Sequence, residues 1–595
     1  MERGAVSERV LFSDLIRNSR LALTNRLRLA RRRRLGYVVM PMQGSYPERI
    51  PRRERSFPLS LLPWPPPPPS VQSFTTALER LAADPRVEGV VLVLSGLSAG
   101  PATLASLRQA IGRFRESGKG TVCYVKEGGM WAYYLASACE RIYAPESGGL
   151  QSAGLWSEAV FLKDTLALAG IEADFESVGA YKASPDTFRR SDMDAPHREM
   201  LESLLDSIYE HLLEALAAAR GLQRDDVRAL LDAAPLSAGD AHKGGLLDGV
   251  CYEDELPALL GSANKPATLV TWKQAHRLLL GPRRWHTRRS IGVISLEGVI
   301  APGPSRRPPV PLPLPIPLPE QQAGADTLVG QLRAAARNKH LAAVVLHVDS
   351  PGGSALASDL IWREVAQVRQ SKPVVVYMSN QAASGGYYVA APASRIVAQP
   401  LTLTGSIGIW GGKIVTRDLF AKLRANREVV SRGEAAGLYS DTAPFTDEQR
   451  LRIRAHILEG YERFKARVGA GRGMAAGEVE AVAQGRVWTG AQALSHGLVD
   501  ALGDLHEAVR QASELAGLPA GRAVPLVNLP LPKTYQLPVT SPGDAAAWLV
   551  AGLEPGEMPQ PGAAALAGVS VLAHLVALLR EGQLALAPWQ IRIRD

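Results

Sequence analysis

The chain has 595 residues, of which 46% are hydrophobic, and this exceeds what one hydrophobic core usually serves, so we expect two or more globular domains. Three widely spaced cysteines, Cys123, Cys139 and Cys251, argue against both a disulfide framework and a metal site. The formal net charge of +9 is concentrated in the first 34 residues and the body is nearly neutral, so nucleic acid is not expected as a partner.

Residues 1–34 form a basic leader with ten arginines and three acidic residues. Leucines and isoleucine alternate with the arginines, as in a helix that lies on an anionic membrane surface. A solvated basic tail is the alternative. No stretch of the leader is long and apolar enough for a secretory signal or a spanning helix. We therefore expect a peripheral membrane association and leave the side of the membrane open.

The body of the chain contains an internal repeat at a fixed offset of 254 residues, which continues without a gap over about ninety positions. The aligned identical pairs include Val90 with Val344, Tyr133 with Tyr387, Arg141 with Arg395, Ser152 with Ser406, Asp164 with Asp418, and Ser177 with Ser431. We interpret the chain as a tandem duplication of one α/β unit, with the first repeat over 35–284 and the second over 285–520.

Each repeat has the same predicted order of a strand, a proline-rich loop, a helix, and then strand, helix and strand. Alternating strands and helices indicate a parallel sheet, buried on both faces, with right-handed crossovers. The proline runs either bind a partner or form a stiff rim around an opening. The expected segments are strands at 36–40, 90–94, 291–296 and 344–348, proline runs at 63–69 and 308–315, and long helices at 201–218 and 448–468.

The second repeat contains a serine in a setting suited to nucleophilic catalysis. Residues 374–378 predict a buried strand, and a helix-compatible run follows Ser384, Gly385 and Gly386. A serine at such a strand-to-helix corner lies beside unpaired helix amides, which attract negative charge. Acyl transfer needs this combination of a nucleophile and donors for an oxyanion. The alternative is a capping serine in a glycine turn.

Three motifs in order resemble those of the signal peptide peptidase A (protease IV) family: 349–354 (DSPGGS), 382–386 (AASGG) and 403–408 (LTGSIG). The resemblance runs from about residue 35 to 510 and implies a fold like that of the Clp protease and crotonase enzymes. It also implies a membrane-associated homo-oligomer, a tetramer in the family. By the same resemblance Ser384 is the nucleophile, Gly353 and Gly385 supply oxyanion amides, and Ser406 orients a lysine base.

The two repeats have lost complementary parts of this set. Met130 stands in the first repeat where the second has Ser384, and Ser98 and Ala99 replace the glycine turn. The segment 179–184 (GAYKAS) resembles the general-base motif of the family, and its Lys182 corresponds to Ala436. On its own Lys182 would be interpreted as a surface lysine. Complementary losses predict one shared site at the interface of the repeats, where burial keeps the lysine neutral.

Two further side chains near the glycine turn are candidates for a catalytic or a structural role. His347 and Asp349 lie on one face of a predicted strand. We interpret His347 as a core or sheet-surface histidine and expect Asp349 to brace the turn at 351–353. No HExxH, paired CxxC or Walker sequence occurs, so no metal or nucleotide cofactor is expected.

The C-terminal region, 521–595, is predicted to be a Pro/Gly-rich linker over 525–561 followed by an apolar segment at 563–579. This segment either packs as a terminal helix or anchors the chain in a membrane.

We predict a serine endopeptidase that acts through an acyl-enzyme and, by resemblance, cleaves signal peptides and other small unfolded chains. A catalytically inactive membrane-associated scaffold is the main alternative. A crotonase-like acyl-CoA enzyme is another, although the glutamates that such chemistry usually needs are not found beside the glycine turns.

Overall fold

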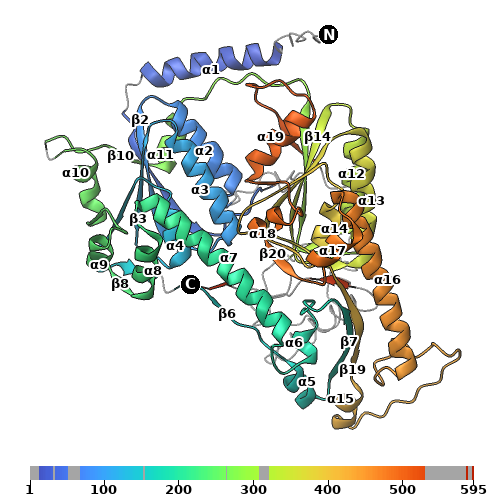
Figure 1. Cartoon of the computed structure of the whole chain (residues 1–595). Coiled ribbons are helices and arrows are strands. Elements are labelled where there is room, and N and C mark those ends of the chain that lie inside the picture. Colours follow the sequence, from blue (N-terminus) through green and yellow to red (C-terminus); the bar gives the residue numbers. More distant parts are fainter. Residues whose placement is uncertain are drawn as a thin grey trace, which may run out of the picture.

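The structure is a computed structural model, and it describes residues 12–30, 34–50, 68–126, 128–151, 154–262, 264–306, 321–529, 584–586 and 593–594. Two mainly parallel sheets stand side by side, one in each half of the chain (Figure 1). Residues 63–67 of the first predicted proline run, all of the second run and the apolar segment at 563–579 lie outside the described residues.

The first sheet has six strands in the order β10-β1-β2-β3-β4-β9, and all its pairings are parallel. The central strands are continuous runs of β-branched and aliphatic residues, as expected of strands that are covered on both faces. The strands are β1 (Gly36–Gly44), β2 (Val87–Leu97), β3 (Gly120–Val125), β4 (Arg141–Ala144), β9 (Gly249–Val250) and β10 (Leu269–Thr271). The main helices that accompany them are α2 (Val71–Ala83), α3 (Pro101–Arg115), α4 (Met130–Ala136) and α7 (Ala195–Arg220).

The second half repeats this plan, with the path β20-β18-β16-β14-β11-β22 and with β17 beside β16. The corresponding strands are β11 (Ser290–Glu297), β14 (Leu341–Ser350), β16 (Val374–Ala383), β17 (Arg395–Ala398), β18 (Leu403–Gly405), β20 (Val487–Thr489), β21 (Ala501–Leu502) and β22 (Leu526–Asn528). The helices are α12 (Ala325–Arg337), α13 (Ala355–Ser371), α14 (Gly385–Ala390), α16 (Asp447–Arg472), α18 (Gly490–Ser495) and α19 (Leu505–Leu515). The predicted duplication of a parallel α/β unit is confirmed.

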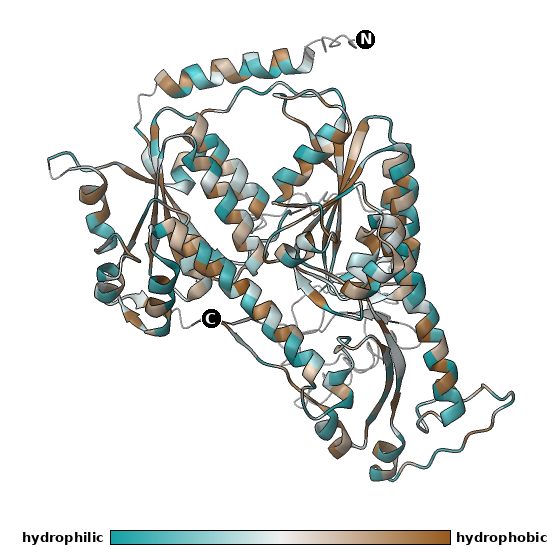
Figure 2. Cartoon of the chain, in the orientation of Figure 1, coloured by the Kyte–Doolittle hydropathy of each residue, from teal (hydrophilic) through white to brown (hydrophobic). Residues whose placement is uncertain are grey.

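The hydrophobic core is divided between the halves, and the strands and inner helix faces are its brown, apolar parts (Figure 2). Polar contacts then join the halves: the Asn380 amide donates to Thr103 Oγ1 over 2.9 Å, and Arg113 pairs with Asp504 over 2.6 Å. The two sheets are therefore fixed relative to one another by contacts of specific side chains.

A third sheet combines strands of both halves in the order β13-β12-β15-β23-β19-β7. It contains β7 (Glu172–Val178) from the first half, which pairs antiparallel with β19 (Ile409–Val415) over seven residue pairs. Its other strands are β12 (Val299–Ala301), β13 (Gln322–Gly324), β15 (Gly352–Ser354) and β23 (Leu584–Leu586). In this sheet a segment of the first repeat, β7, is hydrogen-bonded to a strand of the second repeat.

The C-terminal region contains strands that the sequence did not predict, and the first of them lies within the predicted linker at 525–561. Residues 526–528 are β22, which pairs in parallel with β11 at the edge of the second sheet. Residues 584–586 are β23, in the third sheet. The proline and glycine content of the region suggested a linker, but the apolar residues at 526–527 suffice for an edge strand, and strand pairing depends on a distant partner.

The leader contains the helix α1 (Phe12–Ala30), which lies along the outside of the molecule (Figure 1). It is docked on the segment that links the halves: Asn25 exchanges two hydrogen bonds with Gly281, and Asp14 accepts one from the His286 amide over 2.6 Å. Several apolar side chains remain exposed, among them Leu23 and Leu27. Within the described residues, no helix has the length and apolar character needed to cross a bilayer.

Candidate active site

Ser384 lies where β16 ends and α14 begins, as the sequence predicted. Its backbone has φ of 54° and ψ of −113°, a conformation that non-glycine residues rarely adopt and that costs on the order of 1–3 kcal/mol. The surrounding structure holds it there: the Ser384 amide donates to the Gly405 carbonyl over 2.7 Å, and its carbonyl accepts from the Tyr388 amide. Such a strained corner is typical of a nucleophile that must project from a sheet.

Glycines surround this serine because the backbone segments approach too closely for a side chain. A Cβ on Gly386 would lie 2.9 Å from the Ser350 carbonyl oxygen. Gly353 has φ of +157°, and a Cβ there would lie 2.0 Å from the Ile300 carbonyl oxygen. Gly385 is the first residue of α14, so its amide has no partner within that helix. α14 packs against β15, which brings the two predicted oxyanion glycines to the same corner.

The residue that braces the glycine turn is Ser350, and the expectation for Asp349 was wrong. Ser350 Oγ donates to the Gly298 carbonyl and accepts from the Gly352 amide over 3.1 Å. The Asp349 carboxylate instead accepts from the Gln381 amide over 3.1 Å, so it holds the end of β16. Side chains alternate along β14, and the local sequence did not reveal which neighbour each one faces.

Lys182 reaches Ser384 from the other half of the chain. The lysine follows β7, and its Nζ lies 2.8 Å from Ser384 Oγ, 3.0 Å from Ser406 Oγ and 3.1 Å from the Ser406 carbonyl oxygen. All three residues are buried, with Lys182 only 2% exposed. The two sequence positions are 202 residues apart, and the pairing of β7 with β19 brings them together.

Sequence reasoning missed the loop at 483–487 that encloses Lys182. The Tyr181 amide donates to the Gln484 carbonyl, and the Ser406 amide donates to the Arg486 carbonyl. A Cβ on Gly485 would lie 2.6 Å from Lys182 Cα. No motif identified this loop; an isolated glycine two residues before the β-branched and aromatic run at 487–489 was its only signal.

Burial determines the electrostatics of the site. It lowers the pKa of Lys182 well below its usual value, and no acidic group contributes to this shift. An ammonium here would be desolvated without a counter-charge, so the neutral amine is favoured. Burial therefore shifts Lys182 toward the neutral form, which is the form that a base requires.

His347 is a core histidine, as the sequence analysis interpreted it. Its Nε2 lies 2.9 Å from Ser379 Oγ, and its ring stacks on Tyr377 with centroids 5.6 Å apart. Burial lowers the pKa of His347 to about 3. Among the described residues, no group of three or more His, Cys, Asp or Glu side chains is arranged to hold a metal ion.

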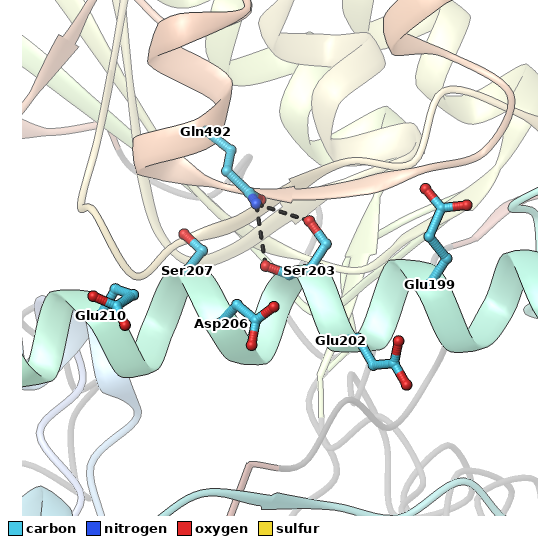
Figure 3. A pocket seen from close by; sticks show the side chains of 7 residues that line it. All are labelled: Glu199, Glu202, Ser203, Asp206, Ser207, Glu210 and Gln492. Atoms are coloured by element: carbon cyan, nitrogen blue, oxygen red, sulfur yellow. Dashed lines mark hydrogen bonds between the residues drawn. The ribbon is translucent and has the colours of Figure 1, made fainter. Parts of the chain in front are cut away.

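An open pocket lies elsewhere, along α7 (Figure 3). Gln492 of the second half donates there to Ser203 Oγ over 3.0 Å, and Ser207 Oγ lies 2.8 Å from Thr489 Oγ1. The remaining lining side chains are acidic: Glu199, Glu202, Asp206 and Glu210. These hydrogen bonds join α7 to β20 and α18, the strand and helix that follow the loop at 483–487.

The slot between β15 and β19, beside the glycine turn, is occupied by a strand of the same chain. β23 pairs antiparallel with β15, so that Ala585 lies opposite Gly353, and it also pairs with β19, where Leu584 lies opposite Trp410. An extended backbone is thus bonded on both edges next to the Ser384 corner.

The equivalent positions of the first half carry no such set. Met130 begins α4 and is fully buried. Ser98 and Ala99 come directly after the end of β2. Ala436, at the Lys182 position, is exposed on a surface loop. The described residues therefore bring together one serine and lysine in each chain.

A parallel α/β fold with a serine at a strained strand-to-helix corner is typical of hydrolases that use a serine as nucleophile. A model of peptidase family S49 matches residues 113–265 and 366–519, once in each repeat. The chain belongs to peptidase family S49 and is a serine peptidase. This result favours the predicted peptidase over the scaffold and the acyl-CoA enzyme.

Proteins similar to this chain include the chloroplastic serine protease SPPA of Arabidopsis thaliana, 34% identical, with 76% of this chain and 67% of the relative aligned. Protease 4 of Haemophilus influenzae is 30% identical over 74% of this chain and 72% of its own length. Among solved structures, a membrane-bound stomatin-specific protease matches 41% of this chain and 95% of its own, at 16% identity and a TM-score of 0.25. ClpP1 from Listeria monocytogenes matches 31% of this chain and 86% of its own, at 14% identity and a TM-score of 0.20.

Proposed function

We propose that Ser384 and Lys182 form a catalytic dyad that cleaves peptide bonds. The observation that carries the proposal is the 2.8 Å distance between Lys182 Nζ and Ser384 Oγ in a buried site. A neutral amine has two N–H donors and one lone pair. The Ser406 carbonyl and Ser406 Oγ accept the two N–H groups, which leaves the lone pair for the Ser384 hydroxyl.

In the acylation step, Ser384 Oγ attacks the substrate carbonyl carbon while its proton moves to Lys182 Nζ. The negative charge that develops on the carbonyl oxygen is stabilised by the amides of Gly353 and Gly385. When the tetrahedral intermediate collapses, the C–N bond breaks and the leaving amine takes the proton from Lys182. Water then attacks the resulting ester, again with Lys182 as base, and Ser384 is regenerated. Ser406 keeps the amine pointed at the serine throughout.

The substrate in this proposal is an extended peptide that adds a strand between β15 and β19. β23 supports this binding mode, because its backbone already pairs with both strands. Main-chain hydrogen bonds serve many sequences, so unfolded peptides such as cleaved signal peptides fit the slot better than compact domains. The similarity to the proteases SPPA and Protease 4 supports a peptide as the substrate.

A serine-reactive probe tests the dyad. Ser384→Ala and Lys182→Ala should each abolish labelling and peptide turnover, with a loss of at least about 10³-fold, and the double variant should be no worse than either. Thermal unfolding of each variant serves as the control for folding. Full labelling of Lys182→Ala would exclude the lysine as base, and labelling that persists in Ser384→Ala would exclude the serine.

We also propose that α1 rests on anionic lipid. Its exposed leucines and arginines face outward while Asp14 and Asn25 bond it to the body. Replacing Leu23 and Leu27 by glutamate should abolish binding to vesicles that contain phosphatidylserine, and salt should weaken the binding of the unaltered chain. Salt-insensitive binding by the variant would assign membrane attachment to another segment.

A further inference from the structure

The helix α3 of the first half begins without a capping side chain of its own. Its N-cap is Gly100, which has the extended backbone of a cap, with φ of −68° and ψ of 160°, but no side chain that could accept from the first turn. In the second half the corresponding residue is Ser354, whose Oγ accepts from the Ala357 amide over 3.1 Å. The first repeat therefore lacks the cap that the second repeat has.

A side chain of the second half supplies the missing cap. Asn380 Oδ1 accepts from the Thr103 amide over 3.1 Å, and Asn380 Nδ2 donates to Thr103 Oγ1 over 2.9 Å. Thr103 is the third residue of α3, and the amide at this position is one that an N-cap side chain ordinarily bonds. Gly100 leaves the space for Asn380, because a Cβ on Gly100 would lie 2.4 Å from Asn380 Oδ1. A reciprocal pair of hydrogen bonds thus joins the two halves at the start of α3.

Asn380 lies in a bulge of β16, the strand that leads to Ser384. The register of β14 against β16 shifts between Val348 and Ser350, where one residue of β14 lies opposite three residues of β16, at 379–381. A bulge bends its strand and changes the direction of the side chains that follow, and bulges are common beside active sites. The bulge is therefore placed where it can affect the position of the serine.

Beyond the bulge, the end of β16 fixes Ser384 relative to the lysine. Residues 381–383 pair in parallel with β18, and the Ser384 amide donates to the Gly405 carbonyl over 2.7 Å. Gly405 precedes Ser406, whose Oγ and carbonyl accept from the Lys182 amine. A displacement of the bulge would therefore move Ser384 relative to Lys182.

Two sets of contacts hold the bulge, and they come from different halves of the chain. Within the second half, the Asp349 carboxylate accepts from the Gln381 amide over 3.1 Å and from Asn380 Nδ2 over 3.4 Å. From the first half, Thr103 bonds both the oxygen and the nitrogen of the Asn380 side chain. The residue of the first repeat that corresponds to Asn380 is Lys126, which follows the last residue of β3, and the pairing of β2 with β3 ends there without a register shift.

We propose that Asn380 is a positioning residue for Ser384: bonded to the start of α3, it holds the bulge of β16 in the place from which the serine meets Lys182. The first half then contributes to catalysis twice, through the lysine and through the placement of the serine. This inference rests on the proposed role of Ser384 as nucleophile. Other side chains of α3 also join the halves, among them Ser106, whose Oγ lies 3.0 Å from the Tyr377 hydroxyl, so the halves should stay together without Asn380.

The kinetics of Asn380→Ala on a soluble peptide test this role. The variant should lower kcat by about 10²-fold and leave KM unchanged, since a misplacement of a reacting group by about 1 Å has an effect of this size. The rate of labelling by a serine-reactive probe should fall with kcat. Ser106→Ala is the matched control, because it also removes a hydrogen bond between the halves, but from a regular part of β16, and it should keep full kcat. A full kcat in Asn380→Ala, or an equal loss of kcat in Ser106→Ala, would overturn the proposal.

A second change separates positioning from helix capping. Asn380→Ala removes the three atoms that lie nearest to a Cβ on Gly100, so that Gly100→Ser can then cap α3 as Ser354 caps α13. The double variant should recover the unfolding temperature that Asn380→Ala loses, while kcat should stay low, because the new hydroxyl bonds α3 and not the bulge. Recovery of kcat together with the unfolding temperature would show that Asn380 is only a cap and would overturn the positioning role.

Ser384→Ala in the same labelling experiment distinguishes this inference from the proposed function. If Ser384→Ala is still labelled, the proposed nucleophile is wrong, and the positioning role is overturned with it. If Ser384→Ala is not labelled while Asn380→Ala is labelled at the full rate, the nucleophile stands and only the positioning role is overturned.

Discussion

At the scale of single residues, burial is the property that suits Lys182 to the role of base that we propose for it. Desolvation lowers its pKa, and the two serines around it supply hydrogen bonds without charge. A base must be unprotonated to act, so peptidase activity should rise with pH through this lowered pKa. The rise should come well below the value of about 10.4 for an ordinary lysine.

Lys182→Arg keeps a cation at every accessible pH, so it should remove activity between about pH 5 and 10, by at least about 10³-fold. The measurement is kcat/KM against pH on a soluble peptide. Lys372 is the matched control: it is also a buried lysine, but it bonds only backbone carbonyls of the second half. Lys372→Arg should leave the shape of the profile unchanged. An active Lys182→Arg enzyme would contradict the role of the amine.

Gly485 tests whether the loop around Lys182 sets the position of the base. The residue has φ of +80°, and a Cβ would lie 2.6 Å from Lys182 Cα, so Gly485→Ala should displace the lysine and lower kcat by about 10²-fold. Gly473→Ala is the control, because φ is +68° but no atom lies within 4 Å of the new Cβ. Backbone strain should cost each variant about 1 kcal/mol of stability, and the clash with Lys182 should add to this loss in Gly485→Ala. Equal kcat values in the two would show that the loop does not position the base.

At the scale of elements, β23 occupies the slot in which we propose that substrate binds. Because β23 is tethered to the same chain, it competes with substrate at an effective concentration that its linker sets, on the order of millimolar. Deleting residues 580–595 should therefore lower KM for short peptides several-fold and leave kcat unchanged. Deleting only residues 587–595 keeps β23 and is the control. An unchanged KM after the longer deletion would mean that β23 and substrate bind in different places.

The elements themselves were largely predictable. Periodicity and β-branched runs identified the strands at 90–94 and 344–348 as the centres of β2 and β14. The long helices were found within a few residues of α7 and α16. Short strands such as β22 were not, because three residues carry too little pattern and form only where a partner edge is available.

At the scale of the whole molecule, the site is assembled within one chain even though its parts come from different repeats. Lys182 and Ser384 belong to the same chain in the junction of β7 and β19. Co-purified mixtures of Lys182→Ala and Ser384→Ala chains should therefore show no activity, because neither copy can lend its residue to the other. Mixed samples with distinct tags, captured on both tags and assayed for turnover, provide the measurement. Recovered activity would place the site between copies instead.

The sequence by itself determined the duplicated α/β unit, the strand-to-helix corner at Ser384, and the complementary absence of serine and lysine in the two repeats. These are properties of local pattern and of comparison along one chain. The tertiary structure alone decided that Lys182 meets Ser384, that the Ser406 carbonyl shares the amine, and that the loop of Gly485 encloses it. The physical reason is that distances across 202 sequence positions, and the desolvation of an amine, depend on how two sheets pack, which no local pattern records.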